Sequence, residues 1–278
     1  MDNIMDGKKL SEEMLESIKQ ELKYELIKPS LAVIQIGNDP ASEKYVKNKQ
    51  KACEDVGIYF RHHYFEDDTS ELTIINKIKE LNNDEYVHGI IIQLPIPSHY
   101  NEKRLLNSII NSKDVDGLTD INAGRLAHNK RTLIPCTALA VMELLKKYEV
   151  DLEGKEVVIV GKGKLTGKPL IDLFLQAGST VTICHSKTKN IAKYTKEADI
   201  IVSATGVSNI IKQNMVKKDC VVIDVGINFD KGKQSGDVDF AKVSKVAQLI
   251  TPNPGGVGPM TVAMLIQNVM TCFRSKKK

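Results

Sequence analysis

The sequence predicts an α/β protein with two lobes, each built on a parallel sheet, and a cleft between them. Along both halves of the 278-residue chain, apolar runs of strand length alternate with amphipathic stretches of helical periodicity. A polar stretch at 114–135, which contains two glycines, interrupts this alternation and is typical of a crossing between lobes. The length also exceeds that of most single domains, so we expect two.

The first lobe is expected to alternate helices and strands. Leu10, Met14, Ile18 and Leu22 recur at every fourth position and predict an opening helix over 7–26. The strands expected after it are 31–36, 58–64 and 89–93, and the further helices are 41–56, about 71–81 and 101–110. Pairing of strands that are linked through helices builds a parallel sheet.

The second lobe is expected to begin with a helix over 136–148. Its predicted strands are 156–160, 180–184, 199–202, 221–225 and 248–251. A last apolar helix begins at Pro259, and we expect the segment 259–278 to pack back on the first lobe. The predicted boundaries are therefore 1–135 for the first lobe and 136–258 for the second.

Composition excludes several classes of protein. With 42% hydrophobic and 27% charged residues, the chain is predicted to fold. No apolar run has the length of a signal peptide or of a membrane helix. Five scattered cysteines without metal-ligand spacing are typical of buried thiols in a reducing compartment. The net charge of +4, with lysines spread along the chain, does not favour nucleic acid. We expect a cytoplasmic protein with no metal, membrane or nucleic-acid partner.

The segment 157–167 has the pattern of a dinucleotide site. An apolar strand, Val157–Val160, runs into a turn with Gly161 and Gly163 and then into a helix that begins near Gly167. Glycines allow the backbone to approach a pyrophosphate, and the free N–H groups of the helix start stabilise its charge. A tight loop without a ligand is the alternative, but the strand-turn-helix setting favours binding.

The residues after the next strand favour NADP over NAD. An acidic residue there would bind the ribose hydroxyls of NAD, but 185–189 reads His-Ser-Lys-Thr-Lys, which suits a phosphate. A solvated basic loop is the alternative. Two later segments, 203–206 and 224–228, place a glycine at a strand end and are expected to line the nicotinamide, although a plain turn explains either glycine alone.

A candidate catalytic pair lies on the helix 41–56. Tyr45 and Lys49 are four residues apart and share a helix face. Burial beside an aromatic ring lowers the pKa of a lysine, which can then serve as a base near neutral pH. By this spacing alone, a solvent-exposed lysine beside a tyrosine at the core edge is the better interpretation.

Five segments in order carry a resemblance to a known family. They are Tyr45–Lys49, Gln93–Pro95, Lys113–Gly117, Pro135–Thr137 and Pro252–Thr261. Together they closely resemble the bifunctional methylenetetrahydrofolate dehydrogenase/methenyltetrahydrofolate cyclohydrolase family, and the resemblance covers nearly the whole chain.

The resemblance implies a role for each matching residue. Lys49 would be the catalytic base, Tyr45 would lie against the aromatic ring of folate, and Gln93 would hydrogen-bond Lys49. Asp116 would accept hydrogen bonds from the pterin. Gly258 and Pro259 match the loop beside the folate, and the cofactor positions are Gly161, Lys162, Gly163, Ser186 and Ile227. The range 1–135 would then be the folate-binding catalytic domain and 136–258 the NADP-binding Rossmann domain.

The implied reaction is the oxidation of 5,10-methylene-tetrahydrofolate with NADP, followed by hydrolysis of the methenyl product to 10-formyl-tetrahydrofolate. One cleft would serve both steps, and the family resemblance alone implies a homodimer. The glycine-rich turn departs from the family pattern, because Lys162 and Gly163 stand where Arg-Ser is usual. Lysine keeps the charge but not the bidentate fork, so use of NAD stays open.

Two other classes of protein share some of these motifs. A short-chain dehydrogenase also uses a tyrosine and a lysine four residues apart, but its glycine-rich turn lies near the start of the chain, whereas here the order is reversed. A dinucleotide-binding regulator or sensor without catalysis is suggested by the altered turn at Lys162. The joint presence of Tyr45, Lys49, Gln93 and Asp116 argues against that alternative.

Overall fold

The computed structural model describes residues 3–230 and 233–276, so 277–278 of the expected terminal segment lie outside it. The chain forms two compact units. The three-stranded unit comprises 12–125, 131–136 and α10 from Val262 onward. The five-stranded unit comprises the described part of 1–11, then 126–130 and 137–261.

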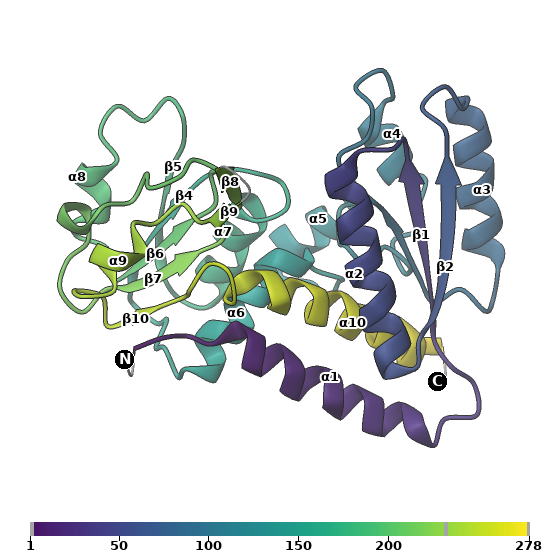
Figure 1. Cartoon of the computed structure of the whole chain (residues 1–278), viewed down its shortest axis with the longest axis horizontal. Coiled ribbons are helices and arrows are strands. Elements are labelled where there is room, and N and C mark those ends of the chain that lie inside the picture. The colour runs from purple at the N-terminus through teal and green to yellow at the C-terminus, as the bar shows by residue number, and fades with distance from the viewer. Residues whose placement is uncertain (1–2, 231–232, 277–278) are drawn as a thin grey trace. The chain divides into compact units, whose positions relative to one another are not determined.

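The three-stranded unit contains a parallel sheet of order β2-β1-β3, of which Figure 1 labels β1 and β2 side by side. Its strands are β1 (Ser30–Ile36), β2 (Tyr59–Phe65) and β3 (Gly89–Ile92). The helices are α1 (Gly7–Lys23), of which Glu12 onward belongs here, α2 (Pro40–Val56), α3 (Glu71–Asn83), α4 (Glu102–Leu106) and α5 (Asp120–Ala127). The predicted α/β class with a parallel sheet is confirmed.

Local signals place the helix that carries the candidate catalytic pair. Asp39 accepts a hydrogen bond from the Ser42 backbone N–H at 2.7 Å, which caps α2, and Pro40 occupies the first helical turn. Gly57, at φ 88°, ends the helix in the left-handed conformation that favours glycine. The expected helix 41–56 is therefore confirmed to within a residue.

Apolar side chains cover the two faces of this sheet. One face is formed by alternate residues of β1 and β3 and is packed under α3 and α4, in a cluster that includes Ala32, Ile34, Ile90, Ile92, Ile74, Ile78 and Leu105. On the other face, a Cβ on Gly89 would lie 2.5 Å from Val115 and 3.2 Å from Val269 of α10 (Val257–Lys276). Glycine at position 89 allows β3 and α10 to approach closely.

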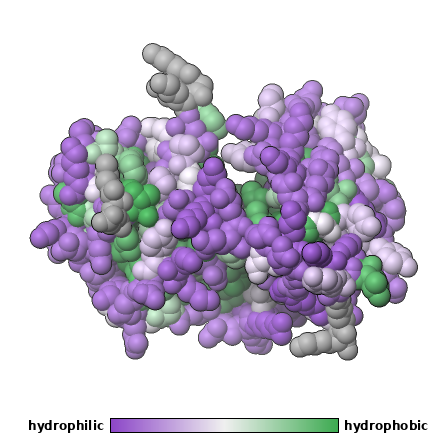
Figure 2. Space-filling view, turned by 60° about the horizontal axis from the view of Figure 1, so that its bottom comes forward, coloured by the Kyte–Doolittle hydropathy of each residue, from purple (hydrophilic) through white to green (hydrophobic). Residues whose placement is uncertain are grey.

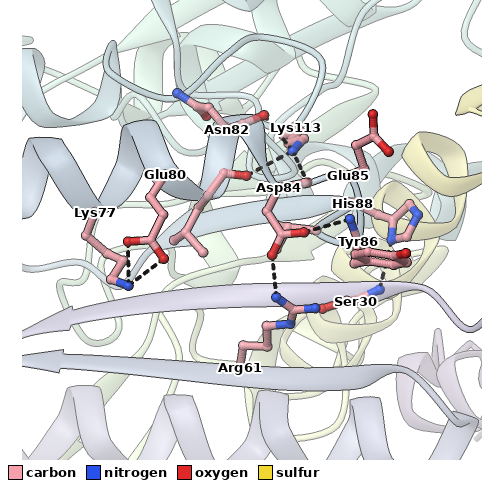
Figure 3. A network of polar contacts seen from close by, with 12 residues as sticks. Ser30, Arg61, Lys77, Glu80, Asn82, Asp84, Glu85, Tyr86, His88 and Lys113 are labelled. Carbon is pink, nitrogen blue, oxygen red and sulfur yellow. Dashed lines mark hydrogen bonds and ion pairs between the residues drawn. The ribbon is translucent and has the colours of Figure 1, made fainter.

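A polar network ties the end of α3 to the amino ends of the strands (Figure 3). The Lys113 ammonium donates to the carbonyls of Leu81, Asn82 and Asp84 at 2.9, 2.7 and 2.7 Å. A cation at the last carbonyls of a helix is stabilised by the helix dipole. Nearby, Arg61 pairs with the Asp84 carboxylate at 2.6 Å.

His88 in this network is expected to make stability depend on pH. Its buried ring accepts a hydrogen bond from the Ser30 N–H through Nδ1 at 3.2 Å, and burial lowers the pKa of His88 to about 4. Because this pKa lies below the unfolded value of about 6.5, the unfolded chain binds the proton first. Stability is therefore lost as the pH falls from about 6.5 to 4.

We expect the free energy of unfolding to fall by about 2 kcal/mol more in the unmodified protein than in His88→Gln between pH 7.5 and pH 5. Gln at this position keeps an acceptor for Ser30 but does not titrate. Urea unfolding of both proteins at the two pH values measures this difference. Equal pH dependence in the two proteins would contradict the assignment.

The five-stranded unit contains a parallel sheet of order β10-β7-β6-β4-β5. Its strands are β4 (Glu156–Val160), β5 (Thr180–Cys184), β6 (Ile200–Ser203), β7 (Val221–Asp224) and β10 (Leu249–Ile250). The helices are α6 (Cys136–Lys147), which belongs here from Thr137 onward, α7 (Gly167–Gln176), α8 (Ala192–Thr195), η1 (Gln213–Met215) and α9 (Phe240–Val243). All five expected strands are confirmed, with ends that differ by at most one residue.

Two local expectations were wrong, and one hairpin was not expected. The predicted helix 101–110 ends at Leu106, and the Ile110 N–H donates to the Asn82 side chain at 3.1 Å in place of a helical carbonyl. The interval 114–135 contains the helix α5. The hairpin of β8 (Asn228–Asp230) and β9 (Lys233–Ser235) was not expected.

The start of the chain belongs to the five-stranded unit, in contrast to the predicted range 1–135. Ile4 bridges to Ile250, and the Met5 N–H donates to the Ile250 carbonyl at 2.8 Å. The Asn3 amide also binds the carbonyls of Ser244 and Ala247. The sequence gives no signal for this edge pairing. The functional domain limits, including 136–258, stay a prediction.

The surface and the thiols agree with the composition. The face in Figure 2 is mostly hydrophilic, with small hydrophobic patches. Within 3–230 and 233–276, no helix combines the length and the apolar character needed to cross a membrane. All five cysteines are buried free thiols, as expected. The described residues contain no group of three or more His, Cys, Asp or Glu side chains that could hold a metal ion.

Candidate active site

Lys49 and Gln93 are joined directly. Lys49, on α2, donates from Nζ to Gln93 Oε1 at 2.7 Å. Gln93 follows β3 and is buried, and its Nε2 donates to the Leu94 carbonyl at 2.6 Å. Because the amide nitrogen is already engaged, the Gln93 oxygen is directed at Lys49. The contact that the resemblance implies between these two side chains is confirmed.

Tyr45 lies one helical turn before Lys49 on α2. Its side chain is 38% exposed, whereas Lys49 is only partly exposed. The tyrosine ring is thus available for stacking against a planar ligand. The Lys49 amine, by contrast, is withdrawn from water. The interpretation of Lys49 as a solvent-exposed lysine is wrong.

Asp116 brings a carboxylate near this amine. It lies in the turn between Asp114 and Gly117, where the Gly117 N–H donates to the Asp114 carbonyl at 3.0 Å. The Cys136 thiol donates to the neighbouring Val115 carbonyl at 3.3 Å, and Cys136 lies close enough to Asp116 to lower the pKa of its carboxyl, against the larger effect of burial. Gly117 has φ 64°, and a Cβ there would lie 2.7 Å from the backbone of Ile134. Glycine therefore permits this turn to lie against the segment that leads into Cys136.

Burial shifts the pKa of each group in this cluster. It lowers the pKa of Lys49, and the nearby Asp116 carboxylate opposes part of that shift. Burial raises the pKa of Asp116, with the Lys49 charge acting in the opposite direction. The Cys136 thiol has a pKa raised well above its ordinary value, again chiefly through burial, and is therefore an unreactive neutral donor. The free amine of Lys49 is accessible closer to neutral pH than in an exposed lysine.

Two neighbours of this cluster were missed by the sequence analysis. Cys136 lies in Pro135–Thr137, one of the five segments that carry the family resemblance, but no role was predicted for it. Asn268, on α10, donates to the carbonyls of Val115 and Ile134 at 2.8 and 3.0 Å. Asn268 lies among apolar residues of a buried helix, far along the chain from Val115. Neither periodicity nor spacing predicts this contact.

In the glycine-rich turn of the five-stranded unit, backbone atoms approach two of the glycines so closely that a side chain would not fit. Gly161 has φ 120°, and a Cβ on it would lie 2.2 Å from the Ala204 carbonyl oxygen. A Cβ on Gly167 would lie 2.0 Å from the Gly161 carbonyl oxygen. Both glycines are therefore required by the packing at the start of α7. This fits a dinucleotide pyrophosphate held by the helix start.

The other predicted cofactor positions are at the surface of the same unit. Lys162 and Gly163 are exposed, and a Cβ on Gly163 would meet no atom within 4 Å. Ser186 is exposed after β5, and Ile227, which is 39% exposed, follows β7. All four thus lie at or beyond the carboxyl ends of strands β4, β5 and β7, the edge at which open α/β sheets bind ligands.

Gly258 and Pro259 lie in the first turn of α10, within the part of that helix that belongs to the five-stranded unit. Gly258 is exposed and Pro259 is partly exposed. Their predicted contact with folate stays a prediction.

Comparison with known proteins identifies the family. Residues 5–116 match the model of the tetrahydrofolate dehydrogenase/cyclohydrolase catalytic domain, and residues 135–277 match the NAD(P)-binding domain of the same family. The chain belongs to the tetrahydrofolate dehydrogenase/cyclohydrolase family. The suspected resemblance is confirmed, and so is the expected combination of a catalytic with a nucleotide-binding domain.

Individual relatives of this dehydrogenase/cyclohydrolase extend over almost the full chain. The bifunctional protein FolD of Campylobacter jejuni (strain RM1221) is 47% identical over 278 residues, covering 98% of this chain and 99% of the relative. A crystal structure of the bifunctional enzyme FolD from Campylobacter jejuni has a TM-score of 0.96 at 46% identity and covers 98% and 99% of the two chains. The FolD structure from Trypanosoma brucei, complexed with NADP cofactor and inhibitor, has a TM-score of 0.95 at 34% identity and covers 99% and 98%.

The two family matches divide the site residues of this dehydrogenase/cyclohydrolase. Tyr45, Lys49, Gln93 and Asp116 fall within the catalytic-domain match, and the glycine-rich turn falls within the NAD(P)-binding match. Cys136, which contacts Asp116, falls within the second match although it packs in the three-stranded unit.

Proposed function

We propose that this chain oxidises 5,10-methylene-tetrahydrofolate with NADP and then hydrolyses the methenyl product to 10-formyl-tetrahydrofolate. The observation that carries the proposal is the partly buried Lys49 amine, held by Gln93 in a chain of this family. Such an amine can take a proton at a pH where an exposed lysine is fully charged.

Lys49 acts in the hydrolytic step as the base that takes a proton from the attacking water or from the intermediate. Gln93 accepts one hydrogen bond from the amine and so orients it. Its amide is itself fixed by the Leu94 carbonyl. A base held in one direction by a rigid neighbour loses little freedom when the reaction occurs.

Asp116 and Tyr45 bind the substrate in this proposal. The Asp116 carboxylate accepts hydrogen bonds from the N–H groups of the pterin, which replace the water that burial removes. The ring of Tyr45 stacks on the aromatic part of folate. Both contacts orient the reacting carbon, which is the main contribution that a protein makes to a reaction between two bound ring systems.

The dinucleotide is held by the five-stranded unit. The turn at Gly161 and the start of α7 bind the pyrophosphate, and Ile227 contacts the nicotinamide side. The bound nicotinamide supplies the acceptor for the hydride of the methylene carbon. NADP is proposed over NAD because no acidic residue occurs in 185–189, where Lys187 and Lys189 provide positive charge.

We also propose that the protein is a cytoplasmic homodimer. Family resemblance is the sole basis for the dimer, and the five buried free thiols, which are typical of a reducing compartment, are the basis for the compartment. Light scattering of the purified protein measures the first, and fractionation of the producing cell tests the second. A regulator without catalysis is not favoured, because the Lys49–Gln93 contact is retained.

Mixing the purified protein with 5,10-methylene-tetrahydrofolate and either NADP or NAD tests the proposal. Absorbance of the reduced nicotinamide and of the methenyl compound is followed separately. We expect reduction with NADP and a methenyl signal that is only transient. Reduction with NAD alone would overturn the choice of cofactor, and accumulating methenyl compound would show that hydrolysis is absent. No reduction with either dinucleotide would favour a binding-only protein.

A further inference from the structure

Two loops at the carboxyl edge of the five-stranded sheet converge on one buried carboxylate. The first follows β6 and includes Thr205 and Val207, and the second follows β7 and includes Ile227 and Asn228. Asp237, which follows the β8–β9 hairpin, is fully buried and lies against both loops. The segments 203–206 and 224–228 that form these loops are the ones predicted to line the nicotinamide, whereas no sequence pattern indicates a role for Asp237.

Five hydrogen bonds reach the Asp237 carboxylate. Its Oδ2 accepts from Ser203 Oγ at 2.9 Å, from the Thr205 N–H at 2.6 Å and from Thr205 Oγ1 at 2.8 Å. Its Oδ1 accepts from the Val207 N–H at 3.0 Å and from Asn228 Nδ2 at 3.2 Å. All five donors are neutral. A buried carboxylate is costly unless such donors satisfy its oxygens.

A second carboxylate interlocks with the first. Asp224, at the end of β7, accepts through Oδ1 from the N–H groups of Gly226 and Asp237 at 3.2 and 2.9 Å. Each carboxylate occupies the space that a Cβ on a nearby glycine would need. A Cβ on Gly226 would lie 1.8 Å from the Asp237 carboxylate, and a Cβ on Gly236 would lie 1.8 Å from the Asp224 carboxylate. The two carboxylates can therefore keep this arrangement only if positions 226 and 236 are both glycine.

This arrangement holds Ile227 from both sides. The preceding Gly226 is bound to Asp224 through its N–H, and the following Asn228 is bound to Asp237 through its side chain. Ile227 itself is 39% exposed. An apolar side chain on a backbone that is fixed at both neighbours is suited to receive a flat ring without rearrangement.

We propose that Asp237 is a positioning residue for the dinucleotide, which fixes the loops around Thr205 and Ile227 in the conformation that receives the nicotinamide. The inference rests on the proposed function, because it assumes that the dinucleotide binds at this edge. Asp237 does not touch the reacting atoms. Its effect passes through the five hydrogen bonds to the loops.

Replacement of Asp237 by Asn separates this role from a general structural one. Asn has the same shape as Asp but carries no charge. Its NH₂ group is itself a donor and would face groups that donate to the Asp237 carboxylate, so these bonds would be lost. We expect the Kd and KM for NADP to rise about 10- to 100-fold. Hydrolysis of methenyl-tetrahydrofolate, measured without dinucleotide, should stay within about twofold, because Lys49 and Gln93 belong to the other unit.

Asp239→Asn is the matched control. Asp239 is two residues away, and its side chain pairs with Lys242 at 2.9 Å near the surface. This variant should leave both the NADP affinity and hydrolysis unchanged. The melting temperature of each variant is measured alongside.

A second pair of variants covers the case in which Asp237→Asn does not fold. Thr205→Val removes one hydroxyl donor to Asp237 at nearly constant volume, and Thr205→Ser keeps it. The KM for NADP should rise in the Val variant and return towards the original value in the Ser variant. A merely structural contact would not produce this pattern with hydrolysis intact.

The outcomes are distinct. Unchanged NADP affinity in a folded Asp237→Asn, or equal effects of Val and Ser at position 205, overturns the inference while the proposed function stands. Parallel loss of hydrolysis and NADP binding also overturns it, because the role is then structural. An unmodified protein that binds neither NADP nor NAD overturns the proposed function and this inference together.

Discussion

Replacing Lys49 by Met is expected to lower the rate of methenyl-tetrahydrofolate hydrolysis by about 100- to 10,000-fold, the usual contribution of a positioned general base. Met has a similar length and removes the amine that Gln93 orients. The Gln93 oxygen is then left without its donor, so some loss of stability is also expected. Steady-state hydrolysis, monitored as the loss of methenyl absorbance, measures the effect.

Two further variants test the chemistry of this residue. Lys49→Arg keeps a positive charge but cannot release a proton near neutral pH, so it should also be inactive in hydrolysis. Lys51→Met removes an exposed lysine two residues later on α2 and should be fully active. Undiminished hydrolysis in Lys49→Met, or full activity in Lys49→Arg, would rule out the assignment of Lys49 as the base.

The pH dependence of the unmodified protein adds an independent check. Burial lowers the pKa of Lys49, and the base must be unprotonated to act. Hydrolysis should therefore fall on the acid side of an inflection that lies below the ordinary pKa of a lysine. This inflection should be missing from the residual rate of Lys49→Met.

Gly161→Ala is expected to abolish oxidation with either dinucleotide. The added Cβ would lie 2.2 Å from the Ala204 carbonyl oxygen, a distance at which the backbone must move. The position also has φ 120°, which an L side chain adopts only with strain of about 1–3 kcal/mol. Displacement of this turn removes the N–H groups expected to bind the pyrophosphate.

Gly124→Ala is the matched control. Gly124 is exposed on α5, outside the predicted cofactor positions, and an added Cβ would meet nothing within 4 Å, so the variant should bind NADP with nearly unchanged affinity. Equilibrium binding of NADP and the rate of reduced nicotinamide formation distinguish the two variants. Normal binding by Gly161→Ala would contradict a phosphate site at this turn.

Much of the fold follows from local patterns along the chain. The predicted strands 156–160 and 180–184 coincide with β4 and β5, since buried parallel strands consist of continuous apolar runs between turns. The bounds of α2 follow from the cap at Asp39 and the stop at Gly57. These signals act over a few residues and need no knowledge of distant neighbours.

The elements that were missed depend on distant partners. The polar start of α5 is held by the Asp114 carboxylate, which accepts from the Leu118 and Thr119 N–H groups at 3.1 and 2.8 Å. The segment around Ile4 is ordered by pairing with β10, which lies more than 200 residues later. No local periodicity contains such a contact.

Residue identity and short spacing were enough to predict the family, the glycine-rich turn and the helix face shared by Tyr45 and Lys49. The position of the Lys49 amine beside Gln93, withdrawn from water, and the five donors to Asp237 are seen only in the folded chain. Burial and hydrogen-bond geometry arise where segments remote in the chain meet. The pKa of a base and the conformation of a ligand-binding loop therefore follow from packing and not from spacing.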